Sequence, residues 1–145
     1  MMTSHPTPRV LLVEDDEVDR MQMERAFSRA GLEVEMITAT DGVEALAELR
    51  GDRERDPLAP PYIVVLDLNM PRMGGLDFLR TLREDSNLKR TVVFILTTSS
   101  HEEEIADCYE LGAAGYTLKG QLMDRSVEFA ELLSRYWSLV ELPTA

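Results

Sequence analysis

The segment 62-YIVVLDLNM-70 places four consecutive aliphatic residues directly before an aspartate. Four other runs rich in Val, Ile and Leu lie before and after it, and helical patterns separate the runs. Continuous apolar runs, unlike alternating ones, suit strands that are covered on both faces, which is typical of a parallel sheet. The sequence therefore predicts an α/β fold in which five helices sandwich a five-stranded parallel sheet. The expected strands are Arg9 to Val13, Val34 to Ala39, Tyr62 to Leu66, Val92 to Leu96, and Gly115 to Leu118.

Five helices are expected between and after these strands. Gly31 is placed to end the first helix in a left-handed cap, and capping-box patterns at Asp41 and Ser100 indicate the starts of the second and fourth. Pro143 should stop the last helix, whose apolar residues suggest two buried faces and hence a homodimer. The residues that mark the first, third and last helices are Met23, Ala26, Phe27 and Ala30; Leu76, Leu79 and Leu82; and Val127, Phe129, Ala130, Leu132, Leu133, Trp137, Leu139 and Val140.

The domain organisation follows from length and composition. A chain of 145 residues with 44% hydrophobic and 29% charged side chains is typical of one globular domain. We expect this domain to span residues 9–140, between a disordered tail at 1–8 and a short tail at 141–145. The stretch 51-GDRERDPLAPP-61 is too rich in proline and charge for a helix or strand, so it is expected to form an exposed loop. No second domain, and so no DNA-binding output domain, is expected.

Charge and cysteine content narrow the function further. Twenty-seven acidic residues against 15 basic ones give a net charge of −12, which disfavours nucleic acid and anionic membranes as partners. The single cysteine, Cys108, allows no internal disulfide, and its apolar neighbours favour a core position. No apolar run is long enough for a signal peptide or a membrane span, so a cytoplasmic location is expected.

Polar residues follow the expected strands at their carboxyl ends, where open α/β sheets bind ligands. They are Glu14 and Asp15 after the first strand, Asp67 after the third, Thr97 after the fourth and Lys119 after the fifth. Several carboxylates at one edge repel one another unless a cation intervenes, and an oxygen-only ligand set suits Mg²⁺ better than Zn²⁺. Asp67 could accept a phosphoryl group and become an aspartyl phosphate, because Lys119 could neutralise charge on the phosphoryl oxygens and Thr97 could donate a hydrogen bond to one of them.

These residues resemble those of the receiver domains of two-component response regulators. Four motifs carry the resemblance in the same order, and together they extend it over most of the chain. They are 11-LLVEDDEVDR-20, 63-IVVLDLNMPRMGGLDFLR-80, 94-FILTTSS-100 and 112-GAAGYTLKG-120. The resemblance implies a flavodoxin-like, chemotaxis-regulator-like sheet of strand order 2-1-3-4-5.

The resemblance also implies a role for each site residue. Asp67 is expected to be the phosphoacceptor, and Lys119 and Thr97 are expected to bind phosphoryl oxygens. Thr97 would also act in a switch with an aromatic residue, Tyr116. The expected Mg²⁺ ligands are Asp15 directly, Glu14 through water, Asp67, and the backbone carbonyl of Asn69. Gly120 departs from the family pattern, in which proline follows the lysine, often through a cis bond, so the peptide geometry after Lys119 is left open.

As a member of this family, the chain would be a phosphorylation switch that takes its phosphoryl group from a sensor histidine kinase and is reset by hydrolysis, rather than a turnover enzyme. Its ending, 136-YWSLVELP-143, resembles single-domain regulators associated with bacterial phytochromes, so the kinase could be a bacteriophytochrome. A homodimer would form through the fourth helix, the fifth strand and the last helix.

Three other functions compete with the switch. A phosphatase of the haloacid-dehalogenase type would need an aspartate where Asn69 stands, and it would need a cap domain. A flavin carrier would need a phosphate-binding loop after the first strand, where acidic residues would instead repel phosphate. A phosphorylation-independent adaptor would not need the full acidic set.

Overall fold

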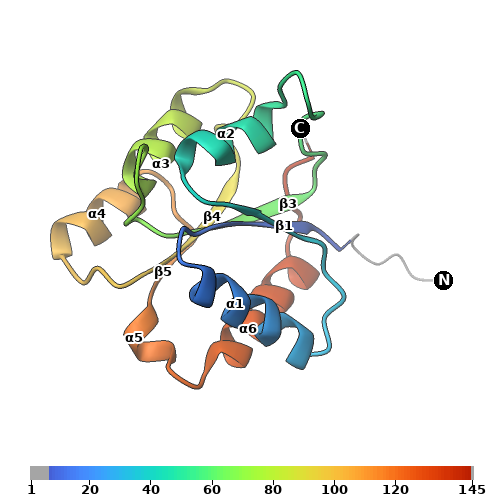
Figure 1. Ribbon diagram of the computed structural model, residues 1–145, viewed down its shortest axis with the longest axis vertical. Helices are drawn as coiled ribbons and strands as arrows, with labels where there is room; N and C mark the ends of the chain where they lie inside the picture. Colours follow the sequence, from blue (N-terminus) through green and yellow to red (C-terminus); the bar gives the residue numbers. More distant parts are fainter. Residues whose placement is uncertain (1–6, 145) are drawn as a thin grey trace.

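The computed structural model describes residues 7–144, which form a five-stranded parallel sheet of order β2-β1-β3-β4-β5 with helices on both faces (Figure 1). The predicted fold class and strand order are therefore confirmed. Most of the expected N-terminal tail, 1–8, lies outside the described residues. The elements are β1 (Arg9–Val13), α1 (Glu17–Arg29), β2 (Met36–Ala39), α2 (Gly42–Arg50), β3 (Tyr62–Leu66), α3 (Gly75–Glu84), β4 (Val92–Thr97), α4 (Glu102–Glu110), β5 (Gly115–Leu118), α5 (Lys119–Leu122) and α6 (Ser126–Leu139).

The strand residues alternate between two cores, because successive side chains of a strand point to opposite faces of the sheet. Figure 1 shows α2, α3 and α4 over one face and α1 and α6 over the other. Both faces of the three central strands are buried, which explains their continuous apolar sequences. The strand residues on the α2–α3–α4 side are Leu11, Val13, Val64, Leu66, Val93 and Ile95, and those on the α1–α6 side are Val10, Leu12, Ile63, Val65, Phe94 and Leu96.

The predicted helix ends are partly confirmed. Asp41 caps α2 by accepting a hydrogen bond from the Glu44 N–H, and Gly31 follows α1 with a φ of 74°. The predicted cap at Ser100 is wrong, because α4 begins at Glu102 with His101 at its N-cap position and no capping side chain. The chain before α4 is instead held to β5, since the Tyr116 hydroxyl donates a 2.7 Å hydrogen bond to the Ser99 carbonyl.

Other boundaries differ by small amounts. The edge strand β2 starts at Met36, two residues later than expected, and β4 extends one residue further, through Thr97. A four-residue helix, α5, was not expected and makes six helices among residues 7–144 instead of five. Its single turn is too short for a repeating apolar pattern to reveal it.

Two backbone features bear on the expected loops. Residues 51–61 contain no helix or strand, as predicted. The one cis peptide bond between residues 7 and 144 joins Pro60 and Pro61, so the Lys119–Gly120 peptide is trans.

The chain after α6 folds back onto the sheet instead of leaving it. Leu142 packs against the core under α1 and α6, and Pro143 lines a small pocket with Leu58 and Tyr62. Within residues 7–144, no helix has the length and apolar character that crossing a membrane requires.

Candidate functional site

The acidic pair after β1 is placed by backbone hydrogen bonds. The Glu14 N–H donates to the Ala39 carbonyl of β2 at 2.8 Å, and the Glu14 side chain is only 3% exposed. Asp15 is exposed at the sheet edge, and Asp16 caps α1 by accepting from the Asp19 N–H at 3.0 Å. Asp16 therefore caps α1, whereas Glu14 and Asp15 lie at the carboxyl edge of the sheet, where a site can form.

Asp67 lies at the carboxyl end of β3 and is 5% exposed. Its N–H donates to the Val13 carbonyl at 3.0 Å, and its Oδ1 accepts a 3.2 Å hydrogen bond from the Asn69 N–H. The backbone at Gly75 lies very close to Asp67, since a Cβ added to Gly75 would lie 2.5 Å from the Asp67 carbonyl oxygen. Glycine at position 75 thus lets α3 begin directly against the phosphoacceptor candidate.

Three carboxylates and one cation meet at this edge. Carboxylate oxygens of Glu14, Asp15 and Asp67 all lie within 4.8 Å of one another. The Lys119 Nζ lies 2.6 Å from Glu14 Oε1 and 3.3 Å from Asp67 Oδ2. It also lies 2.7 Å from Asp19 Oδ2, a contact that the sequence analysis did not anticipate. Four of the predicted site residues are therefore brought together.

The electrostatics of the cluster follow from burial and crowding. Burial raises the pKa of Glu14 to about 7, and the charge of Asp67 adds to this, although Lys119 acts in the opposite direction. Burial disfavours the charged form of Lys119, but hydrogen bonds to Asp19 and Glu14 and the charge of Asp67 outweigh it and raise the Lys119 pKa. Lys119 is therefore a permanent cation among acids that compete for it.

Thr97 lies beside the acids at the end of β4 and is fully buried. Its Oγ1 accepts hydrogen bonds from Asn69 Nδ2 and from the Ser99 N–H, each at 3.4 Å. The Asn69 amide also donates to Thr98 Oγ1 at 3.3 Å. Tyr116 is tied to the same loop through the Ser99 carbonyl, which links the two predicted switch residues by way of Ser99.

The donor set fits a hard divalent cation. Three carboxylates with mutually close oxygens and no sulfur or imidazole ligand match the oxygen coordination that Mg²⁺ and Mn²⁺ prefer. The charge of Asp67 adds to burial in raising the pKa of Glu14, as expected of carboxylates that lie close together without a metal ion between them. The role of the Asn69 backbone carbonyl as a ligand stays a prediction.

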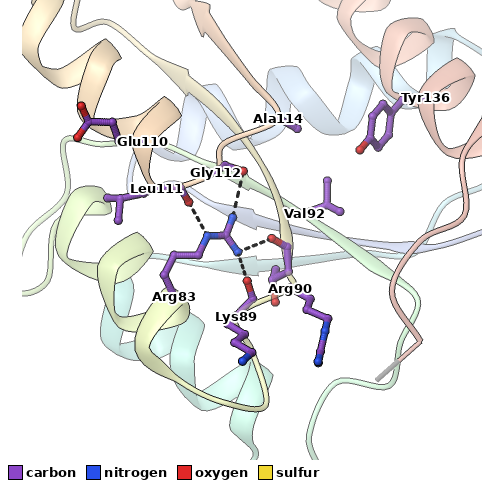
Figure 2. A pocket seen from close by; sticks show the side chains of 10 residues that line it. Arg83, Lys89, Arg90, Val92, Glu110, Leu111, Gly112, Ala114 and Tyr136 are labelled. Carbon is purple, nitrogen blue, oxygen red and sulfur yellow. Dashed lines mark hydrogen bonds between the residues drawn. The ribbon is translucent and has the colours of Figure 1, made fainter.

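A second polar cluster lies at the amino ends of β4 and β5, in an open pocket of about 580 Å³ (Figure 2). The Arg83 guanidinium donates there to four backbone carbonyls, and within the part of the chain that the structure describes it contacts no carboxylate. Two of these carbonyls, of Leu111 and Gly112, follow α4, and the other two, of Lys89 and Thr91, precede β4. Because its donors are occupied by main-chain oxygens, Arg83 joins elements of the fold and offers little to a ligand.

Comparison with known proteins gives a consistent result. The family model for the response regulator receiver domain matches residues 10–130. The response regulator Rcp1 of Synechocystis sp. is 30% identical over 143 residues, covering 98% of this chain and 97% of that protein. The chemotaxis protein CheY1 of Helicobacter pylori is 31% identical over 111 residues, covering 77% of this chain and 84% of that protein.

Solved structures agree with the sequence matches. The phosphorylated cyanobacterial phytochrome response regulator RcpA superposes with a TM-score of 0.85 at 30% identity, covering 95% of this chain and 99% of that one. The Mn²⁺-bound form of Rcp1 gives a TM-score of 0.81 at 29% identity, covering 94% and 99%. RPA3017, a response regulator in red light signalling of R. palustris, gives 0.82 at 31% identity, covering 95% and 99%.

Proposed function

This chain belongs to the response-regulator receiver family, and from that premise we propose that it is a phosphorylation switch whose Asp67 accepts a phosphoryl group from a sensor histidine kinase. The observation that carries the proposal is the contact between Lys119 Nζ and the buried Asp67 carboxylate at 3.3 Å, beside Glu14 and Asp15. A partly buried lysine in contact with a buried acid at the end of parallel strands suits transfer of a phosphoryl group to a carboxylate.

Asp67 is the proposed nucleophile. A carboxylate oxygen of Asp67 would attack phosphorus in line, and the bond from phosphorus to the histidine nitrogen of the donor would break. The bonding electron pair would stay on the imidazole. Lys119 would contact one phosphoryl oxygen as a point charge, and the Thr97 hydroxyl would donate a hydrogen bond to another. Attack of water on the aspartyl phosphate would reset the switch, so the protein would be a phosphoacceptor and not a turnover enzyme.

The acids would hold a divalent cation during this reaction. We propose that the ligands are Asp15, Asp67 and the Asn69 backbone carbonyl, with Glu14 acting through water. When bound, Mg²⁺ would supply charge neutralisation at the phosphoryl oxygens. The requirement is supported by the close approach of the three carboxylates of Glu14, Asp15 and Asp67, which repel one another unless a cation lies between them.

Thr97 and Tyr116 are the proposed switch residues. In the unphosphorylated chain the Thr97 Oγ1 accepts two hydrogen bonds, and the Tyr116 hydroxyl donates to the loop next to it. A phosphoryl group on Asp67 would attract the Thr97 hydroxyl, and Tyr116 would move with the loop. The signal would therefore leave through α4, β5 and α6.

The kinase partner is proposed from the neighbours. RcpA is described as a phytochrome response regulator and RPA3017 as acting in red light signalling, and both cover nearly the whole of this chain. We propose that a phytochrome-type histidine kinase phosphorylates Asp67. Phosphotransfer profiling against purified kinases, with and without light of the appropriate colour, tests this partner. Transfer only from kinases that lack a phytochrome input would exclude it.

A homodimer through α4, β5 and α6 is a further part of this proposal. Of the extra apolar residues expected on α6, Leu132 and Leu139 are 54% and 80% exposed, whereas Val127 is partly buried. Two of the three are therefore not covered by the protomer itself. Light scattering before and after phosphorylation should detect a dimer that Leu132→Glu weakens. A protein that stays monomeric in both states would remove this part of the proposal.

The main test is intact mass after incubation with phosphoramidate. We expect one phosphate per chain in the wild type with Mg²⁺, little without it, and none in Asp67→Asn. Asp77→Asn is the matched control, since this aspartate lies on the exposed side of α3, and it should label like the wild type. An unlabelled wild type, or labelling that persists in Asp67→Asn, would favour the phosphorylation-independent adaptor or another acceptor.

A further inference from the structure

A loop between the phosphoacceptor site and α4 is held at one residue by three different groups. The Ser99 hydroxyl donates to the Glu104 carboxylate, and the Ser99 carbonyl accepts from the Tyr116 hydroxyl at 2.7 Å. The Ser99 N–H donates to Thr97 Oγ1 at 3.4 Å. Ser99 thus connects the switch threonine, the switch tyrosine and the first turn of α4.

Glu104 differs from its neighbours in the same helical turn. Glu102 and Glu103 are exposed, and in the described part of the chain neither makes a hydrogen bond or ion pair. Glu104 is half-buried and turns back to the loop that precedes its own helix. Acids in a first turn are commonly explained by the helix dipole, which accounts for all three equally. The contact with Ser99 is specific to Glu104.

The rest of α4 has few means of fixing its position. Cys108 is its one buried side chain, whereas α3 buries four residues. At the carboxyl end of α4, Arg83 binds the carbonyls of Leu111 and Gly112. The amino end is therefore fixed to the loop chiefly through the Glu104 carboxylate. A helix that is bound at its carboxyl end by Arg83 and buries few side chains elsewhere can shift at its amino end when the contact between Glu104 and Ser99 breaks.

From this arrangement we propose that Glu104 is a positioning residue, which holds Ser99, and through it the loop after Thr97, in the unphosphorylated arrangement. The inference rests on the proposed function, because it concerns how readily Asp67 accepts the phosphoryl group. An interaction made only in the unphosphorylated arrangement must be given up when Thr97 turns to the phosphoryl group, so it slows the reaction.

Two substitutions separate the hydrogen bond from the charge. Glu104→Ala removes both, whereas Glu104→Gln keeps an oxygen that can accept from Ser99 and removes only the charge. Glu103→Ala is the matched control, since it deletes the same charge from the same turn without touching Ser99. Ser99→Ala removes the contact from the other side and serves as a second route if Glu104→Ala folds poorly.

The first readout needs no phosphorylation. Hydrogen exchange of a peptide covering residues 97–101 should be faster in Glu104→Ala and Ser99→Ala than in the wild type. Glu104→Gln and Glu103→Ala should exchange like the wild type. Equal exchange in Glu104→Ala and Glu103→Ala would overturn the proposal, whatever the state of Asp67.

The second readout is the rate at which phosphoramidate labels Asp67 with Mg²⁺ present. We expect a rise of roughly five- to tenfold in Glu104→Ala and Ser99→Ala, in keeping with the net contribution of one hydrogen bond. The double variant should be no faster than either single variant. If Glu104→Gln is as fast as Glu104→Ala, the charge alone acts and the positioning role is wrong. An unlabelled wild type would instead contradict the proposed function, while the exchange data would still decide the contact.

Discussion

Two cations, at opposite edges of the same sheet, are held in contrasting ways. At the carboxyl edge, Lys119 contacts the carboxylates of Glu14, Asp19 and Asp67. At the amino edge, Arg83 donates to four backbone carbonyls (Figure 2). Both side chains are partly buried. The partners of Lys119 are carboxylates, whereas those of Arg83 among residues 7–144 are neutral carbonyls.

The pKa values of Lys119 and Arg83 are shifted in opposite directions by these surroundings. Burial disfavours the charged form of each side chain, and it lowers the pKa of Arg83 because neutral carbonyls do not compensate. The acids around Lys119 outweigh burial and raise its pKa. The carboxyl edge therefore consists of charges that depend on one another and would respond to a phosphoryl group or a metal ion. At the amino edge, Arg83 holds main-chain segments together, and this edge should not respond to a phosphoryl group or a metal ion.

The largest expected effect is on the chemistry of the carboxyl edge. Lys119→Ala should slow the labelling of Asp67 by phosphoramidate about a hundredfold, in line with the loss of one charge-stabilising donor. Intact mass against time measures this rate. Lys89→Ala, which removes an exposed lysine at the amino edge, is the control and should label at the wild-type rate. Similar rates in the two variants would break the distinction between the edges.

The next largest effect is on stability at the amino edge. Arg83→Met keeps an apolar stem but leaves four carbonyls without their donor, so the free energy of unfolding should fall by about 2–3 kcal/mol. Urea unfolding measures it. Arg90→Met changes an exposed residue of the same pocket and should cost less than about 0.5 kcal/mol. The folded Arg83→Met protein should still be labelled, and a loss of labelling comparable to that of Lys119→Ala would contradict a purely structural role.

Metal binding should stabilise the fold through the carboxyl edge of the sheet and not through the amino edge. A cation that binds the folded chain at ten times its dissociation constant adds about 1.4 kcal/mol to the free energy of unfolding. Thermal unfolding with Mg²⁺ and with a chelator should show this gain in the wild type and in Arg83→Met. Asp15→Asn, which removes an exposed carboxylate of the cluster, should lose most of it. An equal gain in Asp15→Asn would place the cation elsewhere.

The smallest effect concerns a structural ion pair close to the site. Burial tends to raise the pKa of Asp41, but hydrogen bonds from the Glu44 N–H at 2.9 Å and Arg72 Nε at 2.7 Å outweigh it and lower that pKa. A lowered carboxyl pKa stabilises the fold above its ordinary value near 3.9, and this stabilisation is lost as the pH falls through the lowered value. Asn can still cap the helix, so Asp41→Asn should lose mainly the charged hydrogen bond with Arg72, which costs about 1 kcal/mol at pH 7 and progressively less below pH 4.

Urea unfolding at several pH values measures that difference. Asp77→Asn, at an exposed position, should show almost no difference from the wild type at any pH. A cost in Asp41→Asn that stays constant down to pH 2 would show that the cap geometry matters and the charge does not.

Sequence patterns predicted correctly those features that depend on residues close together in the chain. The aliphatic run before Asp67 and the polar residues at the strand ends predicted the sheet and the acidic cluster, because parallel strands bring their carboxyl ends together. Asp19 was missed because its partner, Lys119, lies 100 residues away, and an acid in a first helical turn has a simpler explanation in the helix dipole.

Arg83 and Ser100 illustrate the same limit. The sequence analysis did not single out Arg83, because its partners are backbone carbonyls, including those of Leu111 and Gly112, which no sequence pattern identifies. Ser100 matched a capping box, but Tyr116 holds the preceding residue to β5, and the helix starts later. Tertiary contacts decided both outcomes.

The most direct test of the phosphoacceptor assignment is to locate the phosphoryl group chemically. Wild-type protein labelled by phosphoramidate is reduced with borohydride, which converts an aspartyl phosphate into homoserine, and then digested for tandem mass spectrometry. Homoserine at position 67 alone is the predicted result. Homoserine at Asp15 or another acid, with Asp67 intact, would contradict it.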